Sequence, residues 1–190
     1  ANVFAAAVEA CSTGHAAADQ IVKLMEAKGY GLPSAATSSK SASFSTSDRH
    51  HTPSNEGLVV PYFELAKVYA NAKRWKKLAQ LLKRLEACSA LDVPAVEAVL
   101  MVMDAGISAG AVKRLRRLSR GQMRARLKSG PAPCIRTLVS HLVPDKGNRL
   151  SAESAAAYNL GIKLLAKYGD TSGALSMLNK NVWRKPKNRG

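Results

Sequence analysis

The chain has 190 residues, room for one domain or a short array of repeats, and 46% of them are apolar whereas only 5% are aromatic. This composition, rich in Ala and Leu and poor in β-branched runs, favours helix over sheet, so we expect an all-α protein. The 29 basic and 13 acidic residues give a formal net charge of +16, which predicts a polyanionic partner, and no apolar run reaches the ~20 residues of a membrane span.

Residues 1–32 are predicted to form an N-terminal helical hairpin. Apolar residues at helical spacing predict two helices over residues 3–29, with a turn at Gly14 and a stop at Gly29. The next stretch, residues 33–57, is PSAATSSKSASFSTSDRHHTPSNEG. It holds too few apolar side chains to offset the entropy of ordering, so we expect a Ser-rich low-complexity linker there.

A helical-repeat domain is expected over residues 58–181, followed by a basic C-terminal tail at residues 182–190. Apolar residues recur at helical spacing on both sides of Lys73 and Arg74, which predicts a hairpin within PYFELAKVYANAKRWKKLAQLLKRLEA.

The hairpin pattern returns along this domain. A shift of 33 residues carries Pro61 to Pro94 and Lys73 to Gly106, which predicts a second helix pair with its proline in the first turn and its glycine at the reversal. Residues 152–181 predict another pair that reverses at Gly169 and Asp170, and residues 132–143 one extra helix. Since hairpins of this period stack on their neighbours, we expect an α-α superhelix (solenoid) of about four helical hairpins.

Residues 113–128, KRLRRLSRGQMRARLK, contain eight cations and no carboxylate. On one helical wheel of ~100° per residue most of these cations fall within an arc of about 120°, and a bend or break is expected near Gly121. A basic face that only keeps the protein soluble is one interpretation, and a membrane surface or an acidic protein is another. Because like charges at this spacing repel one another without any acidic residue to compensate, we favour phosphate binding.

Three groups of residues are predicted to contact RNA: a turn at residues 73–77, the stretch at 113–128 and the tail. Trp75 either stacks on a base or covers the hairpin core, and the tail is either an extended arm or a frayed terminus. The predicted residues are Lys73, Arg74, Trp75, Lys76, Lys77, Lys113, Arg114, Arg116, Arg117, Arg120, Arg124, Arg126, Lys128, Arg184, Lys185, Lys187 and Arg189.

Three segments resemble the pentatricopeptide repeat (PPR): VYANAKRWKKLAQLLKRLEA, AAAYNLGIKLLAKYGDTSGALSMLNKN and FAAAVEACSTGHAAADQIVKLMEAKGY. Tetratricopeptide (TPR) repeats share this size and shape. The PPR resemblance implies binding of single-stranded RNA in mitochondria or chloroplasts. Base-reading positions would fall on Ala6, Glu64, Glu97 and Leu160, none of which is an amide or a hydroxyl, so the resemblance implies the scaffold more than base-by-base reading.

These observations together predict a structural RNA-binding component of a mitochondrial ribosome or a similar large ribonucleoprotein, in contact with rRNA and neighbouring proteins. The alternative is a TPR-like adaptor for acidic partners or peptides. We expect no enzyme, because no catalytic motif occurs. We also expect no cofactor, no small-molecule substrate and no metal site, because Cys11, Cys88 and Cys134 are far apart and His50 and His51 lie in the linker.

Overall fold

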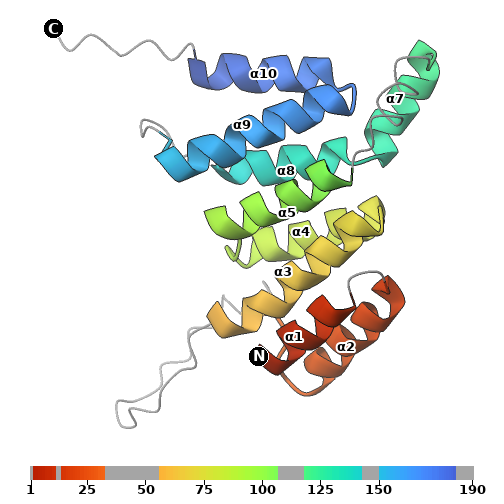
Figure 1. Cartoon of the computed structure of the whole chain (residues 1–190), viewed down its shortest axis with the longest axis vertical. Coiled ribbons are helices and arrows are strands. Elements are labelled where there is room, and N and C mark those ends of the chain that lie inside the picture. Colours follow the sequence, from red (N-terminus) through yellow and green to blue (C-terminus); the bar gives the residue numbers. More distant parts are fainter. Residues whose placement is uncertain (1, 12–13, 33–55, 107–117, 143–149, 183–190) are drawn as a thin grey trace, which may run out of the picture. The chain divides into compact units, whose positions relative to one another are not determined.

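The computed structural model describes residues 2–11, 14–32, 56–106, 118–142 and 150–182, and each secondary-structure element within these ranges is an α-helix (Figure 1). The predicted all-α class is therefore confirmed for the described part of the chain. No helix in these ranges is both long and apolar enough to cross a bilayer. The helices are α1 (Asn2–Ala10), α2 (His15–Ala27), α3 (Glu56–Asn71), α4 (Trp75–Ala87), α5 (Val93–Ala105), α7 (Arg120–Ser129), α8 (Ala132–Leu142), α9 (Ala152–Lys167) and α10 (Thr171–Val182).

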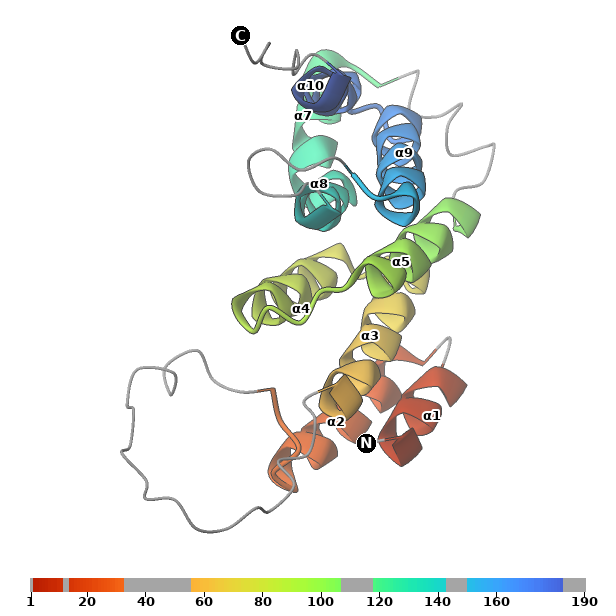
Figure 2. The same cartoon turned by 90° about the vertical axis from the view of Figure 1, so that its left-hand side faces the viewer.

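The helices form two compact units, Ala1–Asp92 and Val93–Gly190. In the first unit α3 lies between α4 and the α1–α2 pair and packs against all three helices (Figures 1 and 2). Leucines from α4 enter the core at a spacing of three and four residues, which is why the predicted amphipathic helix packs where it does. The largest fully buried side chains here are Val8, Met25, Tyr62, Leu78, Leu82 and Leu85.

In the second unit α9 is the central helix, with α5, α8 and α10 packed around it (Figures 1 and 2). Helix α9 packs against α5, α8 and α10, and α5 also packs against α8. This is the order of contacts that α1, α2, α3 and α4 make in the first unit, with α9 in the place of α3. The two units thus share one pattern of helix contacts, and α7 lies outside this pattern in the second unit.

Several predicted turns are confirmed. Helices end and restart around Gly14, at Lys73 and Arg74, and at Gly169 and Asp170. Pro94 is the second residue of α5, and the extra helix predicted at residues 132–143 is α8.

Four helices, α2, α3, α4 and α9, are each followed by a residue in the left-handed backbone conformation. At the end of α3, Lys73 has φ 56°, its N–H donates to the Ala70 carbonyl oxygen at 3.2 Å, and the Arg74 N–H donates to Tyr69 at 2.9 Å. Paired bonds of this kind close a Schellman motif, which reverses the chain tightly after a helix. The equivalent residues of the other three helices are Gly29, Ser89 and Gly169. Lys73 thus takes a turn conformation that glycine usually fills.

Two boundaries differ from those predicted. Helix α3 begins at Glu56, two residues before the predicted start of the repeat domain at residue 58, so Pro61 lies inside the helix and not in its first turn. Proline at this position cannot donate to the carbonyl oxygen of Gly57 and its ring crowds that carbonyl, a local cost near the start of the helix. Residues 1–32 were predicted as separate from 58–181, whereas α1 and α2 pack on α3 in one unit and the chain divides at Asp92.

The basic stretch at 113–128 is also not one continuous helix. The chain is extended at Ser119, with φ −64° and ψ 160°, and α7 begins at the next residue. The predicted break near Gly121 is confirmed but falls two residues earlier, so the predicted common arc of cations from 113 to 128 is wrong. The cause is a capping box: the Ser119 side chain accepts from the Gln122 N–H at 3.3 Å, and the Gln122 side chain accepts from the Ser119 N–H at 3.1 Å.

Candidate nucleic-acid interface

The reversal between α3 and α4 exposes a group of cations, residues 73–77, called the basic turn below. Lys73, Arg74 and Lys76 are exposed and Trp75 is half-buried. Arg74 occupies the N-cap of α4 without a side-chain hydrogen bond to the helix. In the described part of the chain no carboxylate pairs with Lys73, Arg74 or Lys76. Cations here lie at the positive end of the helix dipole, where they are locally unfavourable.

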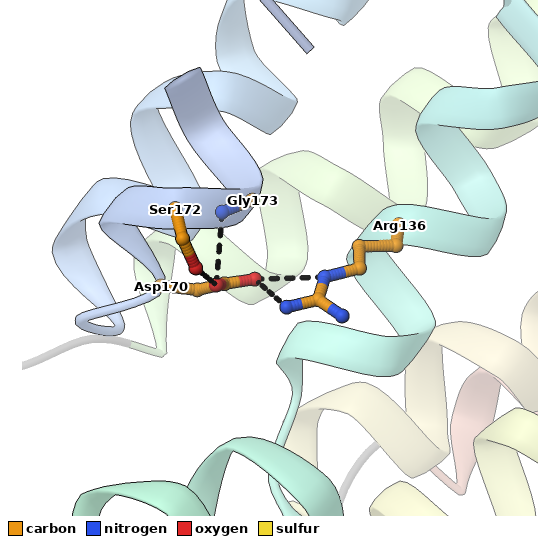
Figure 3. Close-up of polar contacts among 4 residues, drawn as sticks. All are labelled: Arg136, Asp170, Ser172 and Gly173. Carbon is orange, nitrogen blue, oxygen red and sulfur yellow. Dashed lines mark hydrogen bonds and ion pairs between the residues drawn. The ribbon is translucent and has the colours of Figure 1, made fainter. Parts of the chain in front are cut away.

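The corresponding turn before α10 has the opposite charge. Asp170 is fully buried, and its carboxylate accepts from the Gly173 N–H at 3.1 Å and from the Ser172 hydroxyl at 3.2 Å (Figure 3). The Arg136 guanidinium of α8 donates to the same carboxylate, through Nε at 2.8 Å and also through an NH2 group. A carboxylate therefore caps α10 and is neutralised from α8, in keeping with the usual preference of a helix start.

Lys77, the last residue of the basic turn, has a partner inside the protein. Its ammonium contacts the Asp19 carboxylate of α2 and lies 5.6 Å from the centre of the Tyr69 ring of α3. The Tyr69 hydroxyl donates to the same carboxylate. We call Asp19, Tyr69 and Lys77 the Asp19 cluster. Of the predicted RNA contacts in this turn, Lys77 thus already neutralises a carboxylate of its own chain.

The same arrangement occurs again seven residues along each helix. Arg84 of α4 pairs with Glu26 of α2 at 2.6 Å and lies 5.7 Å from the centre of the Tyr62 ring. The Tyr62 hydroxyl donates to Glu26 at 3.1 Å and accepts from the Leu32 N–H at 3.2 Å. This is the Glu26 cluster. The two clusters fasten both α2 and α4 onto α3.

The clusters shift the acidity of their members. Burial raises the pKa of Asp19, but hydrogen bonds from Lys77 and Tyr69 outweigh it, so the pKa lies below the usual value of an aspartate. Burial, together with the nearby Glu26 charge, raises the pKa of Tyr62 to about 12. Burial and the Asp19 carboxylate likewise raise the pKa of Tyr69. Both phenols therefore stay protonated as hydrogen-bond donors at neutral pH.

Helix α7 carries a second group of exposed cations, Arg124, Arg126 and Lys128. Its Met123 and Leu127 are half-buried, and the Met123 sulfur lies against Gly169, 3.1 Å from where a Cβ would be. Within the described residues, neither Arg124 nor Lys128 pairs with a carboxylate. Arg120 begins the helix, and its side chain lies outside the described part.

Further ion pairs lie within α3 and between α5 and α9. Glu64 pairs with Lys67 at 2.6 Å, one turn along α3. Asp104 of α5 contacts both Lys167 and, at 3.7 Å, Lys163 of α9. The ion pairs described above use the cations Lys67, Lys77, Arg84, Arg136, Lys163 and Lys167. The exposed side chains of Lys73, Arg74, Lys76, Arg124 and Lys128 take part in none of them.

The positions that the PPR resemblance marks as base-reading differ in their exposure. Ala6 is exposed on α1, and Glu97 and Leu160 are half-buried on α5 and α9. Glu64 is half-buried and bound to Lys67. None of them presents a hydrogen-bonding amide or hydroxyl, as the sequence already indicated.

Other predicted contacts lie outside the described residues: Lys113, Arg114, Arg116 and Arg117, and in the tail Arg184, Lys185, Lys187 and Arg189. His50 and His51 lie there too. Within the described ranges no three His, Cys, Asp or Glu side chains gather as a metal site would need. Cys134 is buried, and burial raises the pKa of its thiol to about 12, whereas Cys11 and Cys88 are half-buried.

One signal for the clusters was present in the sequence. Asp19 and Glu26, Tyr62 and Tyr69, and Lys77 and Arg84 are each seven residues apart, a spacing that keeps each pair on one helix face.

A scan against protein-family models found no match, and searches of curated proteins and of solved structures likewise found no similar protein.

Proposed function

We propose that this chain is a structural RNA-binding protein that contacts RNA phosphates through its basic turn and α7. The observation that supports the proposal best is the start of α4, where Lys73, Arg74 and Lys76 are exposed at the positive end of a helix and form no ion pair within the described part of the chain. A folded chain tolerates such a local conflict where a partner compensates for it. Phosphate groups would supply the missing negative charge, and the guanidinium of Arg74 can bind two phosphate oxygens at once.

The proposal also covers the fold of the chain and the assembly that contains it. The pattern of helix contacts in each unit supports a PPR-like α-α superhelix, in which each hairpin buries its apolar face on the next. Together with the net charge of +16, this favours a component of a large organellar ribonucleoprotein such as the mitochondrial ribosome. RNA would be held by its backbone and not by reading of its bases, because the reading positions lack suitable side chains.

The test compares neighbouring cations of the same turn. In one variant Lys73, Arg74 and Lys76 are changed to Gln, and in the control only Lys77→Gln is made. Binding of a labelled single-stranded RNA is measured by fluorescence anisotropy over a series of salt concentrations. Each lost phosphate contact lowers the slope of log affinity against log salt by about 0.7, so the triple variant should lose about 2 units of slope.

The control separates binding from folding. Because Lys77 is bound to Asp19, Lys77→Gln should leave the salt slope unchanged and lower the melting temperature instead. An unchanged slope in the triple variant, with the fold intact, would remove the basic turn from the proposed interface. Saturable binding of an acidic peptide with mild salt dependence, in place of RNA, would favour the TPR-like adaptor.

A further inference from the structure

Helix α7 differs from the other helices of its unit in its surroundings. It lies at the end of α8 and is not one of the helices, α5, α8 and α10, that pack around α9 (Figure 1). Its described side chains are exposed or half-buried, whereas α5 and α8 each bury at least four. Since α5 packs directly on α8, α7 lies within a connection between two packed helices. It therefore contributes little to the core that holds the unit together.

The sequence of α7 also opposes helix formation. The helix has 10 residues, RGQMRARLKS, with four cations and no carboxylate. In the sequence Arg120, Arg124 and Lys128 follow one another at a spacing of four, at which like charges on a helix repel one another. Gly121 adds an unfavourable residue near the start. Isolated helices of fewer than about 12 residues are marginal in water even without such repulsion.

Only a few local contacts favour the helical state. The capping box satisfies the N–H groups of Ser119 and Gln122, and the Met123 sulfur packs on the turn at Gly169. At the other end the Gly130 N–H donates to the Arg126 carbonyl oxygen at 2.7 Å. Neutralising Arg124 and Lys128 from outside would remove the main opposing force while leaving these contacts in place.

We infer that α7 is a phosphate-responsive contact helix: RNA phosphates bind its Arg124 and Lys128 face and, in doing so, increase the population of the helical state. The inference rests on the proposed function and adds to it that binding and helix formation are coupled at this one element. Arginine-rich segments commonly fold on RNA in this way. Helix α4, with four buried leucines, should show no such coupling.

The test is amide hydrogen exchange of the full chain, with and without saturating short polyuridine RNA at low salt. RNA should slow exchange in α7 by about fivefold, which corresponds to relief of two like-charge contacts, and leave α4 nearly unchanged as an internal reference. In the variant with Arg124→Gln and Lys128→Gln, exchange in α7 should already be slower without RNA, and RNA should add nothing. The matched control, with Lys73→Gln and Lys76→Gln, should bind RNA more weakly but keep the slowing at saturation.

The outcomes separate this inference from the proposed function. If RNA binds and α7 exchange does not change, or if the Arg124 and Lys128 variant keeps its response, the inference is wrong and the proposed function stands. If RNA does not bind at all, both are wrong. If polyglutamate slows exchange in α7 and RNA does not, the partner is an acidic protein and the phosphate assignment is overturned.

Discussion

Gly161 lies in the interior of α9, where alanine would normally be the better residue. A Cβ at this position would overlap the Val139 Cγ2 methyl of α8 and approach Leu100 of α5. Valine cannot easily rotate away, because its branched Cβ restricts χ1. We expect Gly161→Ala to destabilise the protein by about 1–2 kcal/mol, the cost of overpacking less the gain in helix propensity. Urea unfolding measures this loss.

The control for this substitution is another helical glycine. No heavy atom lies within 4 Å of a Cβ built at Gly121 in α7. Gly121→Ala should therefore stabilise α7 by up to about 1 kcal/mol. Adding Val139→Ala to Gly161→Ala should recover part of the lost stability. If Gly161→Ala is neutral, α8 and α9 pack less closely than described.

The ion pair of Arg136 and Asp170 is the second prediction at this scale. Asp170 is fully buried, so Arg136→Ala would leave its carboxylate without a counter-charge. The arginine itself is partly exposed and water can partly replace it, so we expect a loss of about 2–3 kcal/mol in unfolding experiments. The control is Lys163→Ala, which removes an exposed partner of Asp104 and should cost less than about 0.5 kcal/mol. Equal losses in the two variants would contradict this assignment.

At the scale of elements, the hydrophobic spacing was enough to place the hairpins, because amphipathic patterns and turn residues are local in sequence. The break before α7 was placed two residues late. The pattern S-R-G-Q at residues 119–122 is a capping signature, and Ser119 competes successfully with continuation of the helix. The pairing of Lys77 could not be predicted, because its partner Asp19 lies 58 residues away and only packing of α2 and α4 on α3 brings them together.

The Asp19 cluster makes the stability of α2 on α3 depend on pH. The folded pKa of Asp19 is below its ordinary value of 3.8, so the folded state binds fewer protons than the unfolded state near that pH. Its contribution is therefore fully present above pH 3.8 and is lost as pH falls through the lower folded pKa. Urea unfolding at about pH 5 and about pH 3 should show a smaller pH-dependent loss in Asp19→Asn than in the unchanged protein. Equal losses would mean that other carboxylates cause the acid sensitivity.

At the scale of the whole molecule, the same pattern of helix contacts occurs in both units. In the second unit α5 and α8 take the places of α1 and α2 and are joined by a longer segment, which contains α7. The pattern of 33 residues predicted that the helix following Gly106 would pair with α5, whereas the described helices that pack on α5 are α8 and α9. Residues 107–117 lie outside the described part, so that predicted pairing stays untested. The charge was readable from composition, but which cations are used internally and which are exposed required the packed structure.

The net charge of +16 itself has a consequence for stability. Like charges in a compact fold repel one another, and several exposed cations form no ion pair with another described residue, so salt should stabilise the fold by screening. Raising the ionic strength from about 0.01 M to about 0.15 M shortens the screening distance from about 30 Å to about 8 Å. We expect the melting temperature to rise by about 2–5 °C over this range. Differential scanning fluorimetry measures the change.

The variant with Lys73, Arg74 and Lys76 changed to Gln tests the cause of this rise. It is less positive by three charges that make no described ion pair, so its melting temperature should start higher at low salt and rise less. A fall with salt in the unchanged protein would mean that attraction within the Asp19 and Glu26 clusters outweighs the overall repulsion. In that case the cations would stabilise the folded chain by themselves, and the argument that they require an outside anion would lose its physical basis.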